Sequence, residues 1–488
     1  MNDTPKKING MKKRATKADS TVNPAFSRAM FHMKAAMPRA ESDPYRPSYH
    51  FCAPSQWMND PNGTIYHEGW YHLFYQFNPY SDAWGSMHWG HARSRDLVHW
   101  EHMPIALYPS ESRGEEHCFS GCAAINGDGN PMLFYTSIRK GAAPRDYAEQ
   151  WVAMGDQQFM VWKKIPAPVL IPSASANLVV KDWRDPFIFR DSNRVFMVTG
   201  GKLEEKDGGD AVVLIYEAEN ANLTCWAYRG ILFRHPRKDL QSVECPNFFK
   251  LGDRYVLLLS PYGPVEYFTG ALDLGSLTFK PERQGLVDQS DNYYATNVLF
   301  DGNGRCILFG WVKGFKSNRG WNGCIGLPRV ISLDSDGSLL QETAPETRKL
   351  RSNSIRIPAF TLNRKSQILQ DIKGDSLEIV ADLKPADARV FGIKLRCSAD
   401  GQTAIAIRYD NGVLDVAGTK APAKLDKNGT LSLNVFMDRS VIEVYAGQGA
   451  CITKVVYPDV HDTGVEVFAE DGELNVLCID AWTIQRHM

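Results

Sequence analysis

The chain lacks an excess of charge of either sign, and it lacks any long hydrophobic run. Its 488 residues carry 55 basic and 56 acidic side chains, a formal net charge of −1 at neutral pH. Without a basic stripe the chain is not expected to bind nucleic acid. No apolar run approaches the length that crosses a bilayer, so no membrane association is expected. The length suits two domains.

Paired cysteines are also missing. The ten cysteines show no Cys-x-x-Cys spacing, and scattered single cysteines are typical of a reducing compartment. His117, Cys118 and Cys122 lie close together in the sequence, but no second half-site follows at metal spacing, so zinc is not expected. The first residues are polar and basic and no apolar stretch follows them, which predicts a cytoplasmic protein without a secretory signal.

Residues 1–44 form a predicted N-terminal extension. Residues 1–20 are polar and basic, and we expect them to be mobile. The segment from Pro24 to Ala40 contains apolar side chains that fit an amphipathic helix. Two interpretations remain open for this segment, a helix and a disordered tail.

A repeated pattern begins at residue 60 and recurs at residues 120, 185, 246 and 296. In each copy a short polar start leads into a strand, a Gly-bearing turn and a second, more apolar strand. A period of roughly 40–50 residues or somewhat more, with several strands per unit, is the sequence signature of a β-propeller. The sequence therefore predicts five blades over residues 45–340.

The repeat stops after Arg329, and a different pattern follows. Residues 341–356 are a predicted linker, helical in part. From residue 357 onward apolar and polar residues alternate, which suits half-buried strands. Regular turns between these strands predict an antiparallel β-sandwich over residues 357–488. The predicted fold class is all-β. The sandwich is expected to buttress the propeller, with carbohydrate binding as the alternative.

Three copies of the repeat open on a carboxylate, namely Asp60, Asp185 and Glu244. Inner strands line the channel of a propeller, so equivalent positions in different blades should face one another at one mouth. When several carboxylates share a pocket, one usually stays protonated while the others are ionised. Cleavage of a glycosidic bond requires such a pair. The alternative for each residue is a carboxylate that caps a turn at a strand end.

The residues around these acids resemble glycoside hydrolase family 32, which contains invertases, inulinases, levanases and sucrose-6-phosphate hydrolases. The resemblance covers about residues 45–488. The matching stretches, taken in order, form a specific set: Trp57–Gly63, Trp84-Gly85, His88–His91, Phe119–Gly121, Trp183–Pro186, Glu244–Pro246, Gly310-Trp311, Gly320-Trp321, Leu327–Arg329 and Asp438–Tyr445.

The resemblance implies a retaining mechanism at a β-linked fructofuranosyl unit. It implies Asp60 as the nucleophile and Glu244 as the general acid and then the base. Asp185 would hold fructose hydroxyls and stabilise the positive charge of the transition state. Retention predicts that the carboxyl groups of Asp60 and Glu244 lie about 5–5.5 Å apart. No metal or organic cofactor is implied, since proton transfer and a carboxylate nucleophile suffice.

Seven neighbours of the acids are further candidates for contact with this carbohydrate substrate. Arg184 offers a fork of donors for paired hydroxyls and for keeping Asp185 ionised. Amides suit sugar hydroxyls, and aromatic rings suit the C–H face of a sugar. Cys245 adjoins the acid and either tunes its surroundings or is inert packing. The seven candidates are Trp57, Asn59, Gln76, Trp84, Ser120, Arg184 and Cys245.

The chain departs from the family pattern at three positions. Val243 stands where an aromatic residue is common, Cys122 where a small hydroxyl residue is common, and Asn292 where an aspartate is common. These departures leave recognition of the unit beyond fructose open.

Four functions therefore remain to be separated. The leading one is hydrolysis of β-fructosides such as sucrose or short fructo-oligosaccharides. The others are fructosyl transfer on the same scaffold, hydrolysis of sucrose 6-phosphate, and sugar binding without turnover. A phosphorylated substrate would require cations at the rim, and four residues are candidates by loop position: Lys140, Arg145, Lys313 and Lys316.

Overall fold

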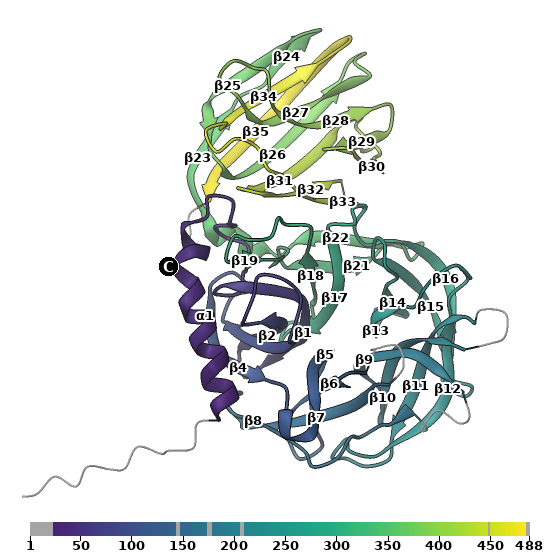
Figure 1. Ribbon diagram of the computed structural model, residues 1–488. Helices are drawn as coiled ribbons and strands as arrows, with labels where there is room; N and C mark the ends of the chain where they lie inside the picture. The colour runs from purple at the N-terminus through teal and green to yellow at the C-terminus, as the bar shows by residue number, and fades with distance from the viewer. Residues whose placement is uncertain (1–22, 143–146, 173–177, 205–208, 448, 485–488) are drawn as a thin grey trace, which may run out of the picture.

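The computed structural model describes residues 23–142, 147–172, 178–204, 209–447 and 449–484. A propeller of five blades is followed by a sandwich of two sheets, drawn in green and yellow in Figure 1. The all-β fold predicted from the repeats is confirmed. The predicted mobile segment, residues 1–20, and the rim candidate Arg145 lie outside the described residues. No helix in the described part of the chain is long and apolar enough to cross a membrane.

Each blade is an antiparallel sheet in which the strands follow chain order from the centre outward. The blades comprise β1 (Gln56–His67), β2 (Trp70–Asn78), β3 (His88–Ser94) and β4 (Trp100–Leu107); β5 (Glu115–Ile125), β6 (Pro131–Arg139), β7 (Glu149–Gly155) and β8 (Trp162–Lys164); β9 (Val180–Asp191), β10 (Arg194–Leu203), β11 (Ala211–Ala218) and β12 (Trp226–Arg234); β13 (Glu244–Leu251), β14 (Arg254–Ser260), β15 (Glu266–Asp273) and β16 (Thr278–Leu286); and β17 (Tyr293–Phe300), β18 (Cys306–Val312), β21 (Arg329–Leu333) and β22 (Leu339–Thr343). A short 3-10 turn, η1 (Glu111–Arg113), precedes β5.

The inner strands β1, β5, β9, β13 and β17 surround one central channel (Figure 1). The later halves of all five strands line a single cavity of about 660 Å³ at one end of this channel. The second strands, such as β6 and β14, are buried along nearly their whole length. A strand that is covered on both faces has a continuous apolar sequence, which explains why the second half of each repeat is more apolar.

A late segment closes the ring. Strand β19 (Trp321–Asn322) pairs in parallel with the start of β1, so that Gln56 is opposite Trp321. Next to it, β20 (Cys324–Ile325) pairs with β18 of the fifth blade. This segment therefore joins the first and fifth blades and covers an inner strand edge that would otherwise be exposed.

The N-terminal segment is a helix, α1 (Pro24–Ser42), which resolves the two interpretations left open. Asn23 caps it by accepting a hydrogen bond from the amide of Ala25, and Pro24 suits the first helical position. The helix lies along the outside of the propeller (Figure 1), and its Ala29 and Met33 are buried in an apolar cluster that also contains side chains of the first and fifth blades. It is therefore part of the folded unit.

The sandwich begins earlier than predicted. Strand β22 of the propeller runs to Thr343 and the 3-10 helix η3 (Pro345–Leu350) follows. The two sheets comprise β23 (Arg351–Ile357), β35 (Glu473–Ile484), β26 (Ser376–Pro385), β31 (Leu431–Asp438), β32 (Val441–Ala446) and β33 (Ala450–Val455), with β24 (Phe360–Asn363) on β35; and β25 (Ser366–Lys373), β34 (Gly464–Ala469), β27 (Val390–Cys397), β28 (Ile405–Asp410), β29 (Val413–Val416) and β30 (Thr419–Pro422). The linker predicted over 341–356 is too long, because Ser352 and its neighbours pair with β35.

A buried network of charges joins the propeller to the sandwich. His50 lies between Asp438 and Glu443, at 2.8 and 2.9 Å. Arg329 of the fifth blade lies 2.9 Å from both Asp288 and Glu443, and its side chain is fully buried. Burial lowers the pKa of His50, but its hydrogen bonds to the two carboxylates outweigh this and raise the pKa to about 9. The network is therefore charged and fixes the two domains together.

Candidate active site

The acids predicted to meet lie at a β-bulge that recurs in the inner strand of every blade. At each bulge two residues stand opposite one residue of the second strand, after which pairing resumes. Such a bulge bends a strand and redirects its side chains. The five bulged pairs are Asn59-Asp60, Phe119-Ser120, Asp185-Pro186, Cys245-Pro246 and Ala295-Thr296.

The three acids occupy different positions of this bulge, which corrects the expectation of equivalent positions. Asp60 is the second residue of its bulge, Asp185 is the first, and Glu244 immediately precedes its bulge. Asp185 and Cys245 have positive φ angles of 62° and 46°, a conformation that non-glycine residues seldom adopt. The acids of the first, third and fourth blades thus stand at three different positions relative to the bulge.

One thiol links the acids. Cys245 Sγ lies 3.5 Å from Asp60 Oδ2 and 3.7 Å from Asp185 Oδ2, and Glu244 is its neighbour in the chain. Burial and the surrounding carboxylates raise the pKa of Cys245 well above its ordinary value. The thiol therefore stays protonated and acts as a hydrogen-bond donor between side chains from the first and third blades.

Asp60 is held at both oxygens. Ser120 Oγ donates to Oδ2 at 2.5 Å, and Asn59 Nδ2 donates to Oδ1 at 3.0 Å. Burial raises the pKa of Asp60, the hydrogen bond from Ser120 opposes this, and the charge of Glu244 adds to the rise. The carboxylate is thus oriented by donors that favour its ionised form.

Asp185 is buried and accepts the backbone N–H of Cys245 at 2.9 Å. Its own N–H donates to Thr136 Oγ1 of the second blade at 2.9 Å. Burial raises the pKa of Asp185 to about 7, although the charge of Arg184 opposes the rise. Near neutral pH this group is therefore a mixture of protonated and ionised forms.

Glu244 is bound by a cation and a phenol. Arg184 Nη2 lies 3.0 Å from Oε1, and the Tyr294 hydroxyl is 2.6 Å from Oε2. Arg184 also contacts Asp182 at 3.2 Å. The nearest ion-pair partners of Arg184 are thus Glu244 and Asp182. Its charge also opposes the rise in the pKa of Asp185, as expected from the sequence.

In three pairs of neighbouring blades, the second strand of one blade hydrogen-bonds to the inner strand of the next at or beside its bulge. Gln76 Nε2 donates to Cys118 O at 2.9 Å, and Ser260 Oγ accepts from the amide of Ala295 at 3.2 Å. Gln76 is only 2% exposed, so the structure gives its amide a role in joining blades. Contact between Gln76 and a sugar stays a prediction.

The two tryptophans predicted from the sequence, Trp57 and Trp84, lie near the bulges of the first and second blades. Trp57 Nε1 donates to Asn59 Oδ1 at 2.7 Å, and its ring centre is 5.6 Å from that of Trp311. Trp84 is 52% exposed and its ring meets Phe119 edge-on, at 6.2 Å between centres. An exposed tryptophan next to the bulge of the second blade provides an apolar surface on which a sugar ring could lie.

Sequence reasoning missed Tyr294 and Tyr262 as site residues. The Tyr294 hydroxyl lies 3.0 Å from Ser260 O and accepts the N–H of Tyr262 at 3.1 Å, besides contacting Glu244. A signal was available, because Tyr294 immediately precedes the bulge of the fifth blade, as Glu244 precedes that of the fourth.

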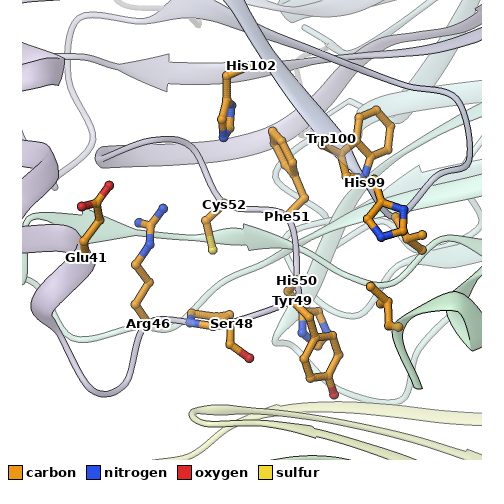
Figure 2. Close-up of a pocket in the computed structure, with 13 residues that line it drawn as sticks. Glu41, Arg46, Ser48, Tyr49, His50, Phe51, Cys52, His99, Trp100 and His102 are labelled. Carbon is orange, nitrogen blue, oxygen red and sulfur yellow. The ribbon is translucent and has the colours of Figure 1, made fainter. Parts of the chain in front are cut away.

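A separate cleft of about 420 Å³ lies where the N-terminal segment meets the first blade and η3 (Figure 2). His50, Phe51 and Trp100 line it, and none of the three acids does. Among the described residues, no three His, Cys, Asp or Glu side chains are grouped so as to hold a metal ion.

The fold and the three converging acids define a glycoside hydrolase, and comparison with known proteins identifies its family. The model of the glycosyl hydrolases family 32 N-terminal domain matches residues 50–343, and that of the family 32 C-terminal domain matches residues 346–483. The chain therefore belongs to glycoside hydrolase family 32, with the β-fructofuranosidase type of activity.

Several relatives resemble the chain over most of its length. A sucrose-6-phosphate hydrolase of Zymomonas mobilis is 31% identical over 93% of this chain and 94% of its own. A levanase of Bacillus subtilis is 29% identical over 91% of this chain and 71% of its own.

Solved structures match as well. The β-fructofuranosidase of Bombyx mori has a TM-score of 0.80 at 26% identity, covering 95% of this chain and 98% of its own. A mutant of that enzyme was determined with sucrose. Fructan 1-exohydrolase IIa of Cichorium intybus, determined with 1-kestose, has a TM-score of 0.81 at 24% identity, covering 91% and 98% of the two chains. This last likeness supports the fold.

Proposed function

We propose that the protein is a retaining β-fructofuranosidase that hydrolyses terminal β-fructosyl linkages of sucrose and short fructo-oligosaccharides through a covalent fructosyl-enzyme. The observation that carries the proposal is the convergence of Asp60 and Glu244 from two blades, in different surroundings. Asp60 is held by hydroxyl, amide and thiol donors. The phenol hydroxyl of Tyr294 lies within hydrogen-bond distance of Glu244.

In the first half of the reaction an Asp60 oxygen attacks the anomeric carbon of the fructosyl unit. The bond from this carbon to the leaving oxygen breaks, and Glu244 gives its proton to that oxygen. In the second half a water attacks the same carbon and gives a proton to Glu244, which releases Asp60 as a carboxylate. Glu244 is therefore protonated at the start of the first half and ionised at its end.

Tyr294 suits both states of Glu244. Its single hydroxyl proton has two acceptors in reach, Glu244 Oε2 at 2.6 Å and Ser260 O at 3.0 Å. When Glu244 is protonated, the hydroxyl turns and donates to Ser260 O, which leaves the proton of the acid free for the leaving oxygen. When Glu244 is ionised, the hydroxyl turns and donates to it. Rotation of the Tyr294 hydroxyl about its C–O bond thus accompanies each change in the protonation of Glu244.

Asp185 and Arg184 suit the fructose hydroxyls and the charge of the transition state. The Nε of Arg184 is buried and hydrogen-bonds to no described residue, so it is available as a donor for a hydroxyl. Asp185 in its ionised form would stabilise the positive charge that develops on the furanose ring. Neither group needs to form a covalent bond.

The test is release of fructose and glucose from sucrose by the purified protein and by three variants. Asp60→Ala should abolish release while the fold persists, and an exposed control, Asp253→Ala, should not change it. Glu244→Gln should be strongly impaired with sucrose, yet less so with a fructoside whose leaving group needs no proton. Near-normal turnover by Asp60→Ala would show that the nucleophile is wrongly assigned.

Fructosyl transfer is the alternative on the same scaffold, because both reactions share the fructosyl-enzyme. They differ in whether water or a sugar hydroxyl attacks it. Analysis of the products at high sucrose concentration separates the two, since free fructose indicates hydrolysis and longer oligosaccharides indicate transfer.

A further inference from the structure

We propose that Cys52 and Cys324 form a redox-sensitive pair of thiols, which hydrogen peroxide converts into a disulfide that locks the ring of blades. Cys52 lies four residues before β1, and Cys324 begins β20 in the segment that closes the ring. Both side chains are free thiols in the structure. Neither residue takes part in the proposed hydrolysis, so the two proposals are independent.

The backbone places the two cysteines opposite each other. Phe51 and Ile325 form an antiparallel β-bridge, in which the N–H of Ile325 donates to Phe51 O at 2.8 Å. One step along, Cys52 therefore faces Cys324. In antiparallel pairing a hydrogen-bonded pair is followed by a non-hydrogen-bonded pair, with Cα atoms about 4.5 Å apart and side chains close together. A disulfide requires Cα atoms about 4.4–6.8 Å apart, so this position suits one.

Packing shows that the two thiols lie on the same side of the bridge. Successive residues of an extended strand point to opposite faces. Phe51 and Ile325 pack in one apolar cluster, whereas Cys52 and Cys324 pack in another, together with Trp321. The two thiols therefore share one face of the bridge and one enclosed environment, as the two halves of a disulfide must.

Cys52 is the thiol that an oxidant reaches and the one that reacts first. It lines the cleft of about 420 Å³ beside Arg46 (Figure 2), whereas Cys324 is fully buried. A hydrogen bond from Cys324 lowers the pKa of Cys52, burial opposes this, and the charge of Arg46 adds to the fall. Burial raises the pKa of Cys324 well above its ordinary value. The thiolate is the nucleophilic form, so Cys52 attacks first and Cys324 second.

The oxidation takes two steps. The Cys52 thiolate attacks one oxygen of hydrogen peroxide and the O–O bond breaks. The hydroxide that leaves takes up the proton lost by Cys52 and becomes water, and Cys52 is then a sulfenic acid. The sulfur of Cys324 attacks the sulfur of Cys52, the S–O bond breaks, and the hydroxide leaves with the proton of Cys324 as water. Two thiols thus lose two electrons and two protons, and one peroxide becomes two waters.

The disulfide ties the entrance of the first blade to the end of the ring. Just before Cys324, β19 already pairs with the start of β1. The new bond encloses most of the propeller in one loop, and in the chain-entropy model a cross-link that closes a long loop restricts the unfolded chain most. Oxidation therefore stabilises the closed ring against unfolding, and a thiol reductant reverses the effect.

The first experiment maps the cysteines of the full-length wild-type protein after treatment with hydrogen peroxide, and it requires no substitution of a buried residue. Remaining thiols are alkylated in denaturant, and the digest is analysed by mass spectrometry without reductant. A peptide pair joined through Cys52 and Cys324, lighter by two hydrogens than the separate peptides, is expected. The exposed thiol of Cys225 reports that the oxidant was effective. Alkylated Cys52 and Cys324 beside an oxidised Cys225 would overturn the proposal.

Thermal unfolding tests whether the bond locks the ring. The Tm of the oxidised wild type should exceed that of the reduced protein by about 2 °C or more, and reductant should abolish the difference. Cys324→Ala should show no rise, whereas Cys306→Ala, which removes another buried thiol, should behave as the wild type. An equal rise in Cys324→Ala, or no rise in a wild type that contains the link, would contradict the locking role. Neither readout requires turnover, so failure of the proposed function would leave both results unaffected.

Discussion

The Ser120 hydroxyl, carried by the second blade, donates a 2.5 Å hydrogen bond to Oδ2 of Asp60 in the first blade. Both residues are the second member of their bulge. The recurring bulge thus provides both the carboxylate assigned as nucleophile and a donor that stabilises its ionised form. This contact leads to the first prediction.

Ser120→Ala should shift the acidic limb of the pH profile of kcat/KM upward. The hydrogen bond lowers the pKa of Asp60 against the effect of burial, so its removal should raise that pKa further. Since the nucleophile acts as a carboxylate, activity should be lost at a higher pH on the acidic side. An unchanged acidic limb would show that the hydroxyl does not govern ionisation of Asp60.

Tyr294→Phe should reduce kcat for sucrose about ten-fold to a hundred-fold, because ionised Glu244 loses the hydroxyl that donates a hydrogen bond to it. The loss should be smaller for a fructoside whose leaving group needs no proton. Tyr293→Phe is a matched control, since the Tyr293 hydroxyl is buried and hydrogen-bonds to no described residue. Equal effects of the two substitutions would rule out a specific role for Tyr294.

Asp185→Asn should be inactive yet more stable at alkaline pH. The folded state holds the proton of Asp185 up to a pKa of about 7, whereas the unfolded chain releases it near pH 4. Stability from this group is therefore fully present below about pH 4 and is lost as pH rises through 7. The asparagine removes this loss.

Thermal unfolding at pH 5 and pH 8 checks the prediction for Asp185. The stabilisation by Asp185→Asn should be larger at pH 8, by up to about 3 kcal/mol. The exposed substitution Asp253→Asn should show no such difference. A gain in stability that is the same at both pH values would contradict the raised pKa of Asp185.

Arg329→Met should destabilise the protein by about 3–5 kcal/mol, because it leaves Asp288 buried without its cation and Glu443 with His50 alone. The exposed ion pair of Arg356 with Asp480 offers the comparison. Arg356→Ala should cost less than about 1 kcal/mol. Denaturant unfolding of both variants measures the difference, and similar losses would mean that the interdomain network does not hold the domains together.

The five blades were predictable because each repeat contains its own strands, turns and buried second strand. The convergence of Asp60, Asp185 and Glu244 was predictable for the same reason, since each begins a repeat. The exact positions were not predictable. They depend on the positive φ angles at Asp185 and Cys245, and neither aspartate nor cysteine indicates such a backbone conformation by itself.

The contacts between blades could not be predicted from the sequence either. Arg184 stands next to Asp185 in the chain, but its side chain contacts Tyr262 and Glu244 of the next blade and Asp182. Likewise the bond between Tyr294 and Glu244 joins the fifth and fourth blades. Such contacts depend on how far each blade is rotated about the channel, which local sequence patterns do not specify.

Mass analysis of a trapped intermediate shows whether Asp60 forms a covalent bond to the fructosyl unit. The Glu244→Gln variant, given a fructoside with an activated leaving group and quenched in acid, should carry one fructosyl unit. Peptide mapping should place it on Asp60, and Asp60→Ala in the same background should carry none. An adduct on Asp185, or active turnover with no adduct at any time point, would show that Asp60 is not the nucleophile.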